Sequence, residues 1–342
     1  MEDPILSMSA STWKRDSHNL FDYESAEISK QDMLVSSSCY LLRIDNAVTI
    51  VQDLSTIDEI AQAQKLARVT KTSQGFFISS CEDLGGEPLW LVIRELEGNA
   101  QGFQLMSGSV LKLGRVKLVM RELENEHEVL STENSSDEEE DDEKICRICF
   151  TGSYPDDPLV SPCICSGTAR YIHFNCLKHW IDMKRNVAQN ETSVAYFWES
   201  FLCEICKHAL PLSMKVRGKR YDLFRLDKHS QTTLVLEVVR KDSQTRGVHL
   251  ISMKPNSRVC LGRGHESDVR VSDISVSRLH AQLNYDGAQF YLKDNSSKFG
   301  SLLQVTGPLH IGISQKAVLQ MGRTVISFEA TNVPTLASCS KY

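Results

Sequence analysis

The 342-residue sequence contains no run of eighteen apolar residues, and its first residues lack a basic stretch followed by an apolar one. The first absence argues against a transmembrane helix, and the second argues against a secretory signal. We therefore expect a soluble intracellular protein, cytoplasmic or nuclear, without a membrane span. In that setting the eleven cysteines are expected to be thiols or metal ligands rather than disulfides.

The net charge of −6 is concentrated in one segment. Residues 133–143, ENSSDEEEDDE, hold eight acidic side chains and no basic one. A run this charged cannot pack against a core, so we interpret residues 126–143 as a solvated linker. Ser135 and Ser136 each precede a glutamate by three residues, which makes them candidate sites for an acid-directed kinase; an unmodified spacer is the alternative.

The first 125 residues carry no motif that assigns a function. Residues 1–38 are polar, rich in serine and without sustained period, so we expect them to be mostly disordered. Residues 39–125 read as a small β-rich region, with one or two strands around Gly114. Residues 55–69 are the exception, because a capping box and a rough apolar stripe predict a helix there.

Cysteine and histidine are crowded between residues 144 and 212, in closely spaced pairs. Short spacings let one turn present two ligands to the same ion, and zinc prefers tetrahedral Cys and His. Eight ligands fill two tetrahedral sites and leave no position for water, so we expect two structural zinc ions and no catalytic residue. A redox C-x-x-C is the alternative, but two such pairs occur here together with C-x-C and H-x-x-C. The eight candidate ligands are Cys146, Cys149, Cys163, Cys165, His173, Cys176, Cys203 and Cys206.

This ligand order, with one residue in the third gap and seven before the histidine, resembles a RING-CH (RINGv) finger. A PHD finger shares the order but fits these gaps poorly. The resemblance implies a cross-braced fold in which Cys146, Cys149, His173 and Cys176 hold one zinc and the other four cysteines hold the second. The last long gap, of 26 residues, is at the upper end for the family, and its extra residues are expected to lengthen a helix or a loop.

RING-type ligases hold a ubiquitin-conjugating enzyme and its ubiquitin in a reactive pose, without a covalent intermediate on the ligase. The resemblance places enzyme-docking residues at Ile148 and Trp180, and local packing around zinc is the alternative for both. Lys207 stands where many RING domains place a cation that contacts ubiquitin; a solvated lysine is the other interpretation. The partners implied are a ubiquitin-conjugating enzyme and ubiquitin.

Residues 233–330 read as short strands with regular turn signals, which predicts a β-sandwich. Gly262-Arg263, then Ser277-x-x-His280, then Gly300 resemble a forkhead-associated (FHA) domain, which reads phosphothreonine. A phosphate dianion needs charged and hydroxyl donors on loops at one end of a rigid sandwich.

The resemblance assigns phosphopeptide contacts to Arg263, Ser277 and Arg278, with Lys298 as a further candidate. His280, Gly262 and Gly300 are expected to be structural. Many members have Asn where this chain has Phe299, so the peptide preference is left open, and an FHA fold that binds another surface is the alternative.

Two further features have weaker readings. The connector at residues 213–232 is basic, but few aromatic residues interleave with its charges, so nucleic acid is an unlikely partner. The stretch that ends at Arg115 and the stretch that ends at Arg263 share a strand-turn-strand pattern before Gly-Arg, which is consistent with a weak repeat or with coincidence. A degenerate FHA-like role for residues 39–125 is a further, weaker hypothesis.

The fold class we predict is multidomain, α+β to mainly β. A cross-braced two-zinc domain is followed by an FHA-type sandwich and a tail over residues 331–342, and preceded by the small β-rich region. The function we predict is a RING-type ubiquitin ligase that recruits threonine-phosphorylated partners. The alternative is a non-enzymatic, phospho-dependent adaptor whose zinc domain is structural.

Overall fold

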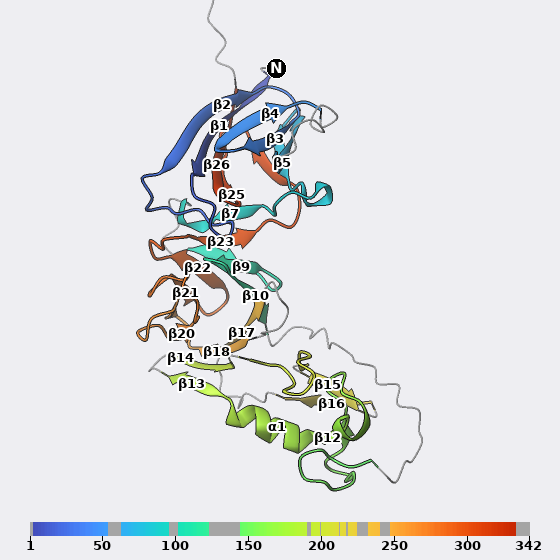
Figure 1. The fold of residues 1–342 in the computed structure, drawn as a ribbon. Helices are drawn as coiled ribbons and strands as arrows, with labels where there is room; N and C mark the ends of the chain where they lie inside the picture. Colours follow the sequence, from blue (N-terminus) through green and yellow to red (C-terminus); the bar gives the residue numbers. More distant parts are fainter. Residues whose placement is uncertain are drawn as a thin grey trace, which may run out of the picture.

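The computed structural model describes residues 3–53, 63–95, 102–122, 144–189, 193–198, 200–211, 213–216, 218–223, 232–239 and 247–332. Three bodies follow one another in space: an N-terminal sandwich, a C-terminal sandwich and a cysteine-rich domain (Figure 1). The mainly-β, multidomain fold class is confirmed. In the part of the chain that is described, no helix combines the length and the apolar character needed to cross a bilayer.

The N-terminal sandwich begins at residue 4, so the prediction of disorder over residues 1–38 is wrong. In the first strand Leu6, Met8 and Ala10 are buried and alternate with serines, a period of two that the serine content concealed. The strands of this sandwich are β1 (Pro4–Trp13), β2 (Ile28–Val35), β3 (Cys39–Ile44), β4 (Ala47–Val51), β5 (Gln64–Thr72), β6 (Gly75–Ser79), β7 (Trp90–Val92), β24 (Leu309–Gly312), β25 (Lys316–Met321) and β26 (Thr324–Asn332).

The prediction of a helix over residues 55–69 is also wrong where the structure describes that stretch. Residues 54–62 lie outside the described residues, and the rest of that stretch enters strand β5. Leu66, Ala67 and Val69 are fully buried in the sandwich core, so tertiary burial overrides the helix propensity of the alanine- and glutamine-rich sequence. The strands expected around Gly114 are confirmed, with the glycine in the turn between them at φ +57°.

The C-terminal sandwich is assembled from both halves of the sequence, as Figure 1 shows. One sheet has the order β20-β19-β21-β22-β8, and the facing strands have the order β18-β17-β10-β9-β23. Its strands are β8 (Phe103–Leu105), β9 (Val110–Leu113), β10 (Val116–Glu122), β17 (Thr232–Val239), β18 (Gly247–Met253), β19 (Ser257–Gly262), β20 (Val269–Arg270), β21 (Ala281–Tyr285), β22 (Phe290–Asp294) and β23 (Ser301–Gln304).

The two sandwiches exchange their last three strands. Strands β8, β9 and β10 pair with β22, β23 and β17 of the C-terminal half. Strands β24, β25 and β26 pair with β6, β7 and β1 of the N-terminal half. The prediction that residues 233–330 form one self-contained sandwich is therefore wrong in its last part, because β24–β26 lie in the other sandwich.

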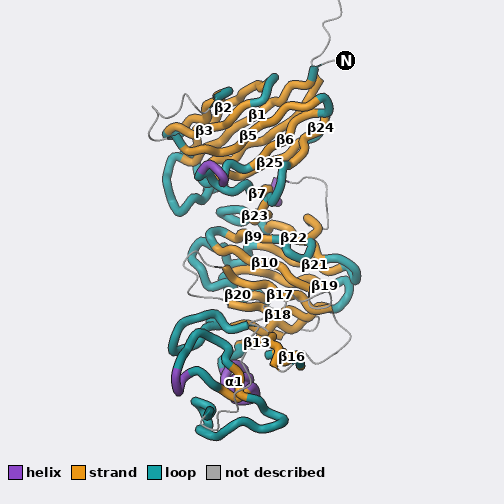
Figure 2. The backbone as a smooth tube through the Cα atoms, turned by 90° about the vertical axis from the view of Figure 1, so that its right-hand side faces the viewer, coloured by secondary structure: helices purple, strands orange, loops and turns teal. Residues whose placement is uncertain are grey.

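Strands β7 and β23 mark the crossing point, because they pair with each other from Val92↔Leu302 to Trp90↔Gln304. This pairing joins the two sandwiches through one continuous twelve-stranded sheet, which the tube view shows running through both (Figure 2). The exchanged hairpins also bear on the repeat that the sequence left open beside coincidence. Arg115 lies in the turn between β9 and β10, and its counterpart in sequence and position is Arg323 between β25 and β26, not Arg263 at the end of β19.

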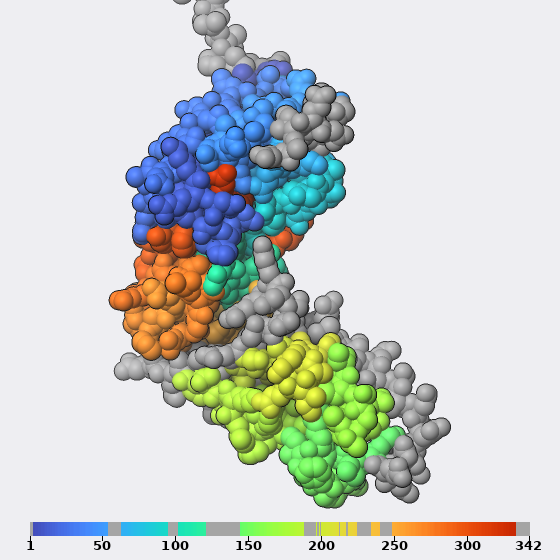
Figure 3. Space-filling model, in the orientation of Figure 1, coloured from blue at the N-terminus to red at the C-terminus, as the bar shows by residue number. Residues whose placement is uncertain are grey.

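The cysteine-rich domain holds one helix, α1 (Phe174–Met183), and short hairpins, and it lies at the end of the molecule opposite the N-terminal sandwich (Figure 3). The long gap before the last two cysteines forms a hairpin whose second strand pairs with β18 of the C-terminal sandwich. The basic connector is structured in part, since residues 213–216 and 219–222 pair in a hairpin. The strands are β11 (Leu159–Val160), β12 (Ile172–His173), β13 (Asn186–Gln189), β14 (Ser193–Trp198), β15 (Ser213–Val216) and β16 (Lys219–Asp222).

One apolar core runs across the boundary between the cysteine-rich domain and the C-terminal sandwich. Trp198 and Phe201 of the former share a buried cluster with Val235, Val248 and Leu250 of the latter. The indole Nε1–H of Trp198 also donates to the carbonyl of Ile181 at the end of α1, at 2.9 Å. The two domains are therefore packed as one body. The acidic linker at residues 126–143 lies outside the described residues.

Candidate metal centres and phosphopeptide site

The first ligand cluster consists of Cys146, Cys149, His173 and Cys176. Its C-x-x-C turn closes when the backbone N–H of Phe150 donates to the carbonyl of Cys146 at 2.8 Å, which places Phe150 at φ +59°. Nδ1 of His173 lies 3.1 Å from Sγ of Cys149, and Nε2 donates to the carbonyl of Gly152 at 2.7 Å. This second bond fixes the tautomer so that the unprotonated Nδ1 faces the cluster, because a metal-ligating histidine usually donates its other ring N–H to such an acceptor.

The second cluster consists of Cys163, Cys165, Cys203 and Cys206. Its C-x-x-C turn repeats the geometry of the first, with the N–H of Lys207 donating to the carbonyl of Cys203 at 2.9 Å and Lys207 at φ +59°. Sγ of Cys165 lies 3.7 Å from Sγ of Cys203. The first and third ligand pairs along the chain form one cluster and the second and fourth form the other, so the two sites are cross-braced.

Both clusters fit a tetrahedral metal ion. The four ligand atoms of each cluster lie within 4.8 Å of one another, and a tetrahedron with metal–sulfur bonds of about 2.3 Å has edges of roughly 3.8 Å. The thiols also need a cation. Backbone N–H groups outweigh burial and lower the pKa of Cys203 to about 6, whereas burial raises the pKa of Cys165 to about 12. A dication supplies the positive charge that allows all four to ionise.

Arg147 is a residue that sequence reasoning missed. It lies inside the first C-x-x-C pair, but its guanidinium donates to Sγ of Cys163 at 3.9 Å and to Sγ of Cys203 at 3.7 Å, both in the second cluster. A third bond to the carbonyl of Ala169, at 2.6 Å, orients the side chain. The arginine therefore ties the first turn to the thiolates of the second site. Nothing in the spacing of the ligands indicates this contact.

The residues assigned to enzyme docking differ in their surroundings. The side chain of Ile148 is 43% exposed, and Lys207 is exposed. Trp180 is half-buried against the core of the domain, with the ammonium of Lys184 4.0 Å from its ring centroid. Glu204, which pairs with Lys184, accepts a hydrogen bond from Trp180. Trp180 thus joins α1 to the last C-x-x-C turn as well as presenting an edge to solvent.

Two further isoleucines of the cysteine-rich domain are also exposed. Ile164 lies between the ligands of the C-x-C pair and is 69% exposed, and Ile205 lies inside the last C-x-x-C and is 62% exposed. Like Ile148, each lies between two metal ligands on a turn that points its side chain to solvent, so neither is part of the core. The shared position within a ligand pair is the signal that sequence reasoning could have used.

In the C-terminal sandwich, the loops after β19, β20 and β22 meet around His280, which is fully buried. Nδ1 of His280 accepts from the backbone N–H of Ser277 at 3.0 Å, and Nε2 donates to the carbonyl of Gly300 at 3.1 Å. Burial lowers the pKa of His280 and keeps it neutral, as these two bonds require. Arg263 and Arg278 are exposed, and Gly262 lies so close to the Arg278 carbonyl that a Cβ would meet it at 2.0 Å.

The loop after β22 carries Lys298 and Phe299 and faces the N-terminal sandwich. The ammonium of Lys298 lies 3.4 Å from a carboxylate oxygen of Asp22, and its backbone N–H donates to Oγ of Ser277 at 3.2 Å. Phe299 packs in an apolar cluster between the sandwiches, with its ring centroid 6.3 Å from that of Trp13. Position 299, which carries Asn in many FHA domains, is thus part of an interface within the chain.

The cysteines outside the ligand set are ordinary thiols where the structure describes them. Cys39 and Cys81 are buried, and burial raises the pKa of Cys39 to about 11. Cys260 is half-buried on β19, and burial raises its pKa as well. Cys339 lies outside the described residues.

Comparisons with known proteins agree with this geometry. The RING-variant domain model matches residues 146–206, and the FHA domain model matches residues 259–325. No solved structure matches the chain significantly.

Three relatives illustrate the likeness, which lies in the RING region. E3 ubiquitin-protein ligase MARCHF7 of Mus musculus is 35% identical over 157 residues, or 44% of this chain and 20% of that protein. Probable E3 ubiquitin-protein ligase MARCHF10 of Homo sapiens is 37% identical over 97 residues, or 28% and 11% of the two chains. Probable E3 ubiquitin ligase SUD1 of Arabidopsis thaliana is 36% identical over 77 residues, or 22% and 6%.

The chain spans a fifth or less of the length of these three relatives. It combines a RING-variant domain over residues 146–206, built on two cross-braced Cys/His clusters, with an FHA domain over residues 259–325.

Proposed function

We propose that this chain is a RING-type ubiquitin ligase that binds threonine-phosphorylated partners through its FHA domain and docks a ubiquitin-conjugating enzyme on its RING-variant domain. The proposal rests on one observation above all: two complete Cys/His tetrads are cross-braced, and isoleucines inside their ligand pairs are exposed. The tetrads would each hold one structural zinc ion. The ligase itself contributes no nucleophile in this mechanism.

Docking on the RING-variant domain accelerates ubiquitin transfer by position. A conjugating enzyme held with its thioester oriented toward an acceptor amine reacts as though the amine were present at very high local concentration. Ile148 supplies an exposed apolar contact on the first ligand turn, and Trp180 adds the edge of its indole. Lys207 on the last turn would contact ubiquitin.

Phosphothreonine binding would use the loops that meet around His280. Arg263 and Arg278 would supply charge-assisted bonds to the phosphate, and Ser277 a hydroxyl donor. Lys298 is a fourth candidate, and its ion pair with Asp22 would have to be shared or broken when phosphate binds.

The ligase proposal is tested by reconstitution with a panel of ubiquitin-conjugating enzymes. Ile148→Ala is the informative variant, because its exposed side chain contributes little to packing, whereas Trp180→Ala also removes core contacts. Ile313→Ala is the matched control, since Ile313 is 40% exposed in the N-terminal sandwich. Ubiquitin chains from wild type and Ile313→Ala, but few from Ile148→Ala at equal zinc content, support the proposal.

The adaptor alternative is favoured by one observation, which is that the cysteine-rich domain shares a core with the C-terminal sandwich and so has a structural role. Absence of ubiquitin chains with every conjugating enzyme, from fully zinc-loaded protein, would exclude the ligase. Binding of phosphothreonine peptides that is abolished by Arg263→Ala would then leave a phospho-dependent adaptor.

A further inference from the structure

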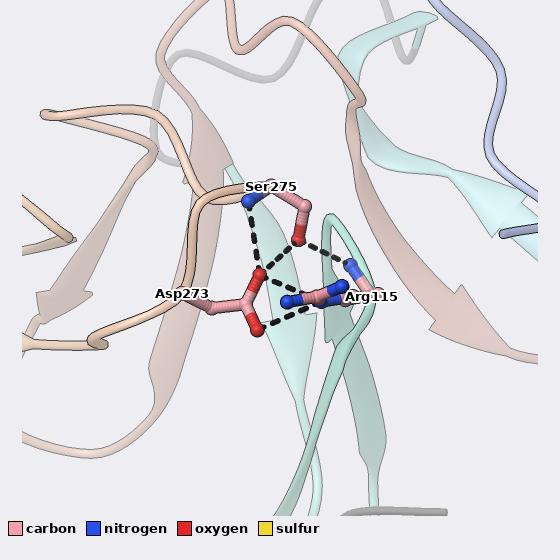
Figure 4. Close-up of polar contacts among 3 residues, drawn as sticks. All are labelled: Arg115, Asp273 and Ser275. Carbon is pink, nitrogen blue, oxygen red and sulfur yellow. Dashed lines mark hydrogen bonds and ion pairs between the residues drawn. The ribbon is translucent and has the colours of Figure 1, made fainter. Parts of the chain in front are cut away.

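The loops after β19, β20 and β22, here called the recognition loops, are held in part by the N-terminal half of the chain, and its exchanged hairpin holds the loop after β20. At the tip of that hairpin, between β9 and β10, Nε of Arg115 donates to both carboxylate oxygens of Asp273, at 2.9 and 2.8 Å. Its backbone N–H donates to Oγ of Ser275 at 2.9 Å. Figure 4 shows that Arg115 approaches both side chains of the loop after β20 from the opposite sheet.

The loop itself is organised around the same carboxylate. The backbone N–H and the hydroxyl of Ser275 both donate to Oδ1 of Asp273, at 2.9 and 2.7 Å (Figure 4). Burial opposes ionisation of Asp273, but these bonds and Arg115 outweigh it, so the pKa of Asp273 lies below its ordinary value. Ser277, the hydroxyl assigned to phosphate, follows two residues later, so its position depends on this network.

The close approach at the hairpin tip requires glycine at position 114. Gly114 has φ +57°, and a Cβ there would lie 2.5 Å from the carbonyl oxygen of Ser275. The exchanged hairpin and the recognition loop are therefore in direct backbone contact as well as paired in charge.

The neighbouring recognition loop, after β22, is also held by the first half of the chain. Arg94 donates to the carbonyl of Ser297 at 3.1 Å, and the backbone N–H of Tyr23 donates to the carbonyl of Lys298 at 3.0 Å. The ring of Tyr23 covers Gly300, where a Cβ would meet it at 2.7 Å. Two of the three loops around His280 thus take their positions from residues before 123.

The other exchanged hairpin makes a corresponding contact in the N-terminal sandwich. Arg323 at its tip donates to the carbonyls of Trp13 and Asp45 in the N-terminal sandwich. In the N-terminal sandwich Ala67 of β5 pairs with Leu41 of β3, and in the C-terminal sandwich Ala281 of β21 pairs with Leu261 of β19. The residues that precede these alanines, Leu66 and His280, therefore occupy corresponding positions.

Leu66 thus stands where the C-terminal sandwich has His280, whose hydrogen bonds to Ser277 and Gly300 join two loops. Arg43 of the same sandwich is turned inward, where it donates to Gln64 and to Thr324 and is 6% exposed. Among its described residues, which leave out 54–62, the N-terminal sandwich repeats these strand pairings with Leu66 in place of His280 and with Arg43 turned inward.

We propose that the phosphopeptide site is composite, with Arg115 of the N-terminal half acting as the positioning residue for the loop that carries Ser277. This inference rests on the proposed phosphothreonine binding. In it, the N-terminal half of the chain serves the FHA domain by strand exchange.

The test compares Arg115→Gln with the matched variant Arg323→Gln in the full-length, zinc-loaded chain. Affinity is measured for a pool of synthetic phosphothreonine peptides with random flanking residues, with the unphosphorylated pool as reference. Because a charge-assisted pair is lost next to the loop, Arg115→Gln should weaken binding by about tenfold. The contacts of Arg323 lie in the other sandwich, so the peptide affinity of Arg323→Gln should stay within about twofold of wild type. Such a change corresponds to less free energy than one hydrogen bond contributes.

Hydrogen exchange separates positioning from general destabilisation. Amides of residues 272–279 should exchange faster in Arg115→Gln than in wild type and be unchanged in Arg323→Gln. Equal affinity and equal exchange in wild type and Arg115→Gln would overturn the inference, even where Arg263→Ala abolishes binding.

A separate result tests the function on which the inference rests. If wild type binds none of the phosphothreonine peptides, the proposed phosphothreonine binding fails, and the composite site fails with it as a phosphopeptide site. Faster exchange in Arg115→Gln alone would then show a positioned loop that serves another ligand.

Discussion

The guanidinium of Arg147, on the first C-x-x-C turn, lies 3.7 Å from Sγ of Cys203 in the second ligand cluster. A cation donating to ligand sulfurs partly neutralises the negative charge that four thiolates bring to one metal ion. The cross-brace thus includes a direct electrostatic contact between the two sites, in addition to the shared chain segments.

Arg147→Gln should weaken metal binding in the second cluster, because Cys163 and Cys203 lose their charged donor. Loss of such an outer contact lowers metal affinity by about tenfold or more. Zinc release to a coloured chelator should show one of the two ions leaving faster than in wild type. Arg170→Gln is the control, since Arg170 is exposed and stacks on Tyr171. Identical release from both variants would exclude the contact.

Removal of zinc should loosen the C-terminal sandwich as well as the cysteine-rich domain. Trp198 and Phe201 share their core with Val235 and Val248, so unfolding around the ligands exposes one side of strands β17 and β18. Hydrogen exchange after chelation should rise in residues 232–239 and 247–253. Strands β3 and β5 of the N-terminal sandwich, which have a separate core, are the internal reference. Uniform protection of β17 and β18 with and without zinc would contradict the shared core.

The metal ligands could be predicted from the sequence because their geometry is local. Pairs separated by one or two residues lie on single turns. The cross-brace between pairs follows only from the resemblance to a RING-CH finger. The contact of Arg147 could not be predicted in this way, since its partners are brought to it only by the folded cross-brace. The roles of Ile148, Trp180 and Lys207 in docking stay predictions.

The strand exchange could not be predicted because the two hairpins are alike. Residues 110–120, VLKLGRVKLVM, and residues 318–328, VLQMGRTVISF, present the same apolar alternation and the same Gly-Arg tip. The apolar pattern of each is compatible with either sandwich, and exchanging similar elements changes few contacts. The chain crosses from one sandwich to the other at β7 and β23, which pair with each other.

Acid should destabilise the C-terminal sandwich through His249, which is buried on β18. Burial lowers its pKa to about 4 in the folded chain, whereas an unfolded histidine titrates near 6.5. The unfolded state therefore binds more protons below pH 6.5, so stability falls as the pH drops from 6.5 toward 4.

The size of this effect is at most about 3 kcal/mol in the free energy of unfolding, from a shift of about 2.5 pH units. His249→Phe removes the titrating group, so the loss of stability between pH 7 and pH 4.5 should be smaller in the variant than in wild type. Comparing the two cancels the contribution of metal release, which both share. An equal loss in both would show that His249 does not titrate in this way.

Gly114→Ala should disrupt the contact between the exchanged hairpin and the recognition loop. Both Gly114 and Gly108 have positive φ, at +57° and +85°, so alanine costs about 1 kcal/mol of backbone strain at either position. Only at Gly114 does the new Cβ also meet a backbone atom, the Ser275 carbonyl oxygen at 2.5 Å, whereas nothing lies within 4 Å at Gly108. The clash can be relieved only by moving the hairpin away from the loop, which lengthens the bonds from Arg115 to Asp273.

Thermal unfolding and phosphopeptide affinity measured on both variants separate strain from clash. Gly108→Ala should lower the unfolding midpoint slightly and leave peptide affinity unchanged, because its methyl group points into open space. Gly114→Ala should lower the midpoint further and reduce affinity in the same direction as Arg115→Gln. Equal losses of stability and equal phosphopeptide affinities in the two glycine variants would show that the hairpin tip does not position the loop. The strand exchange would then have no role in phosphopeptide binding.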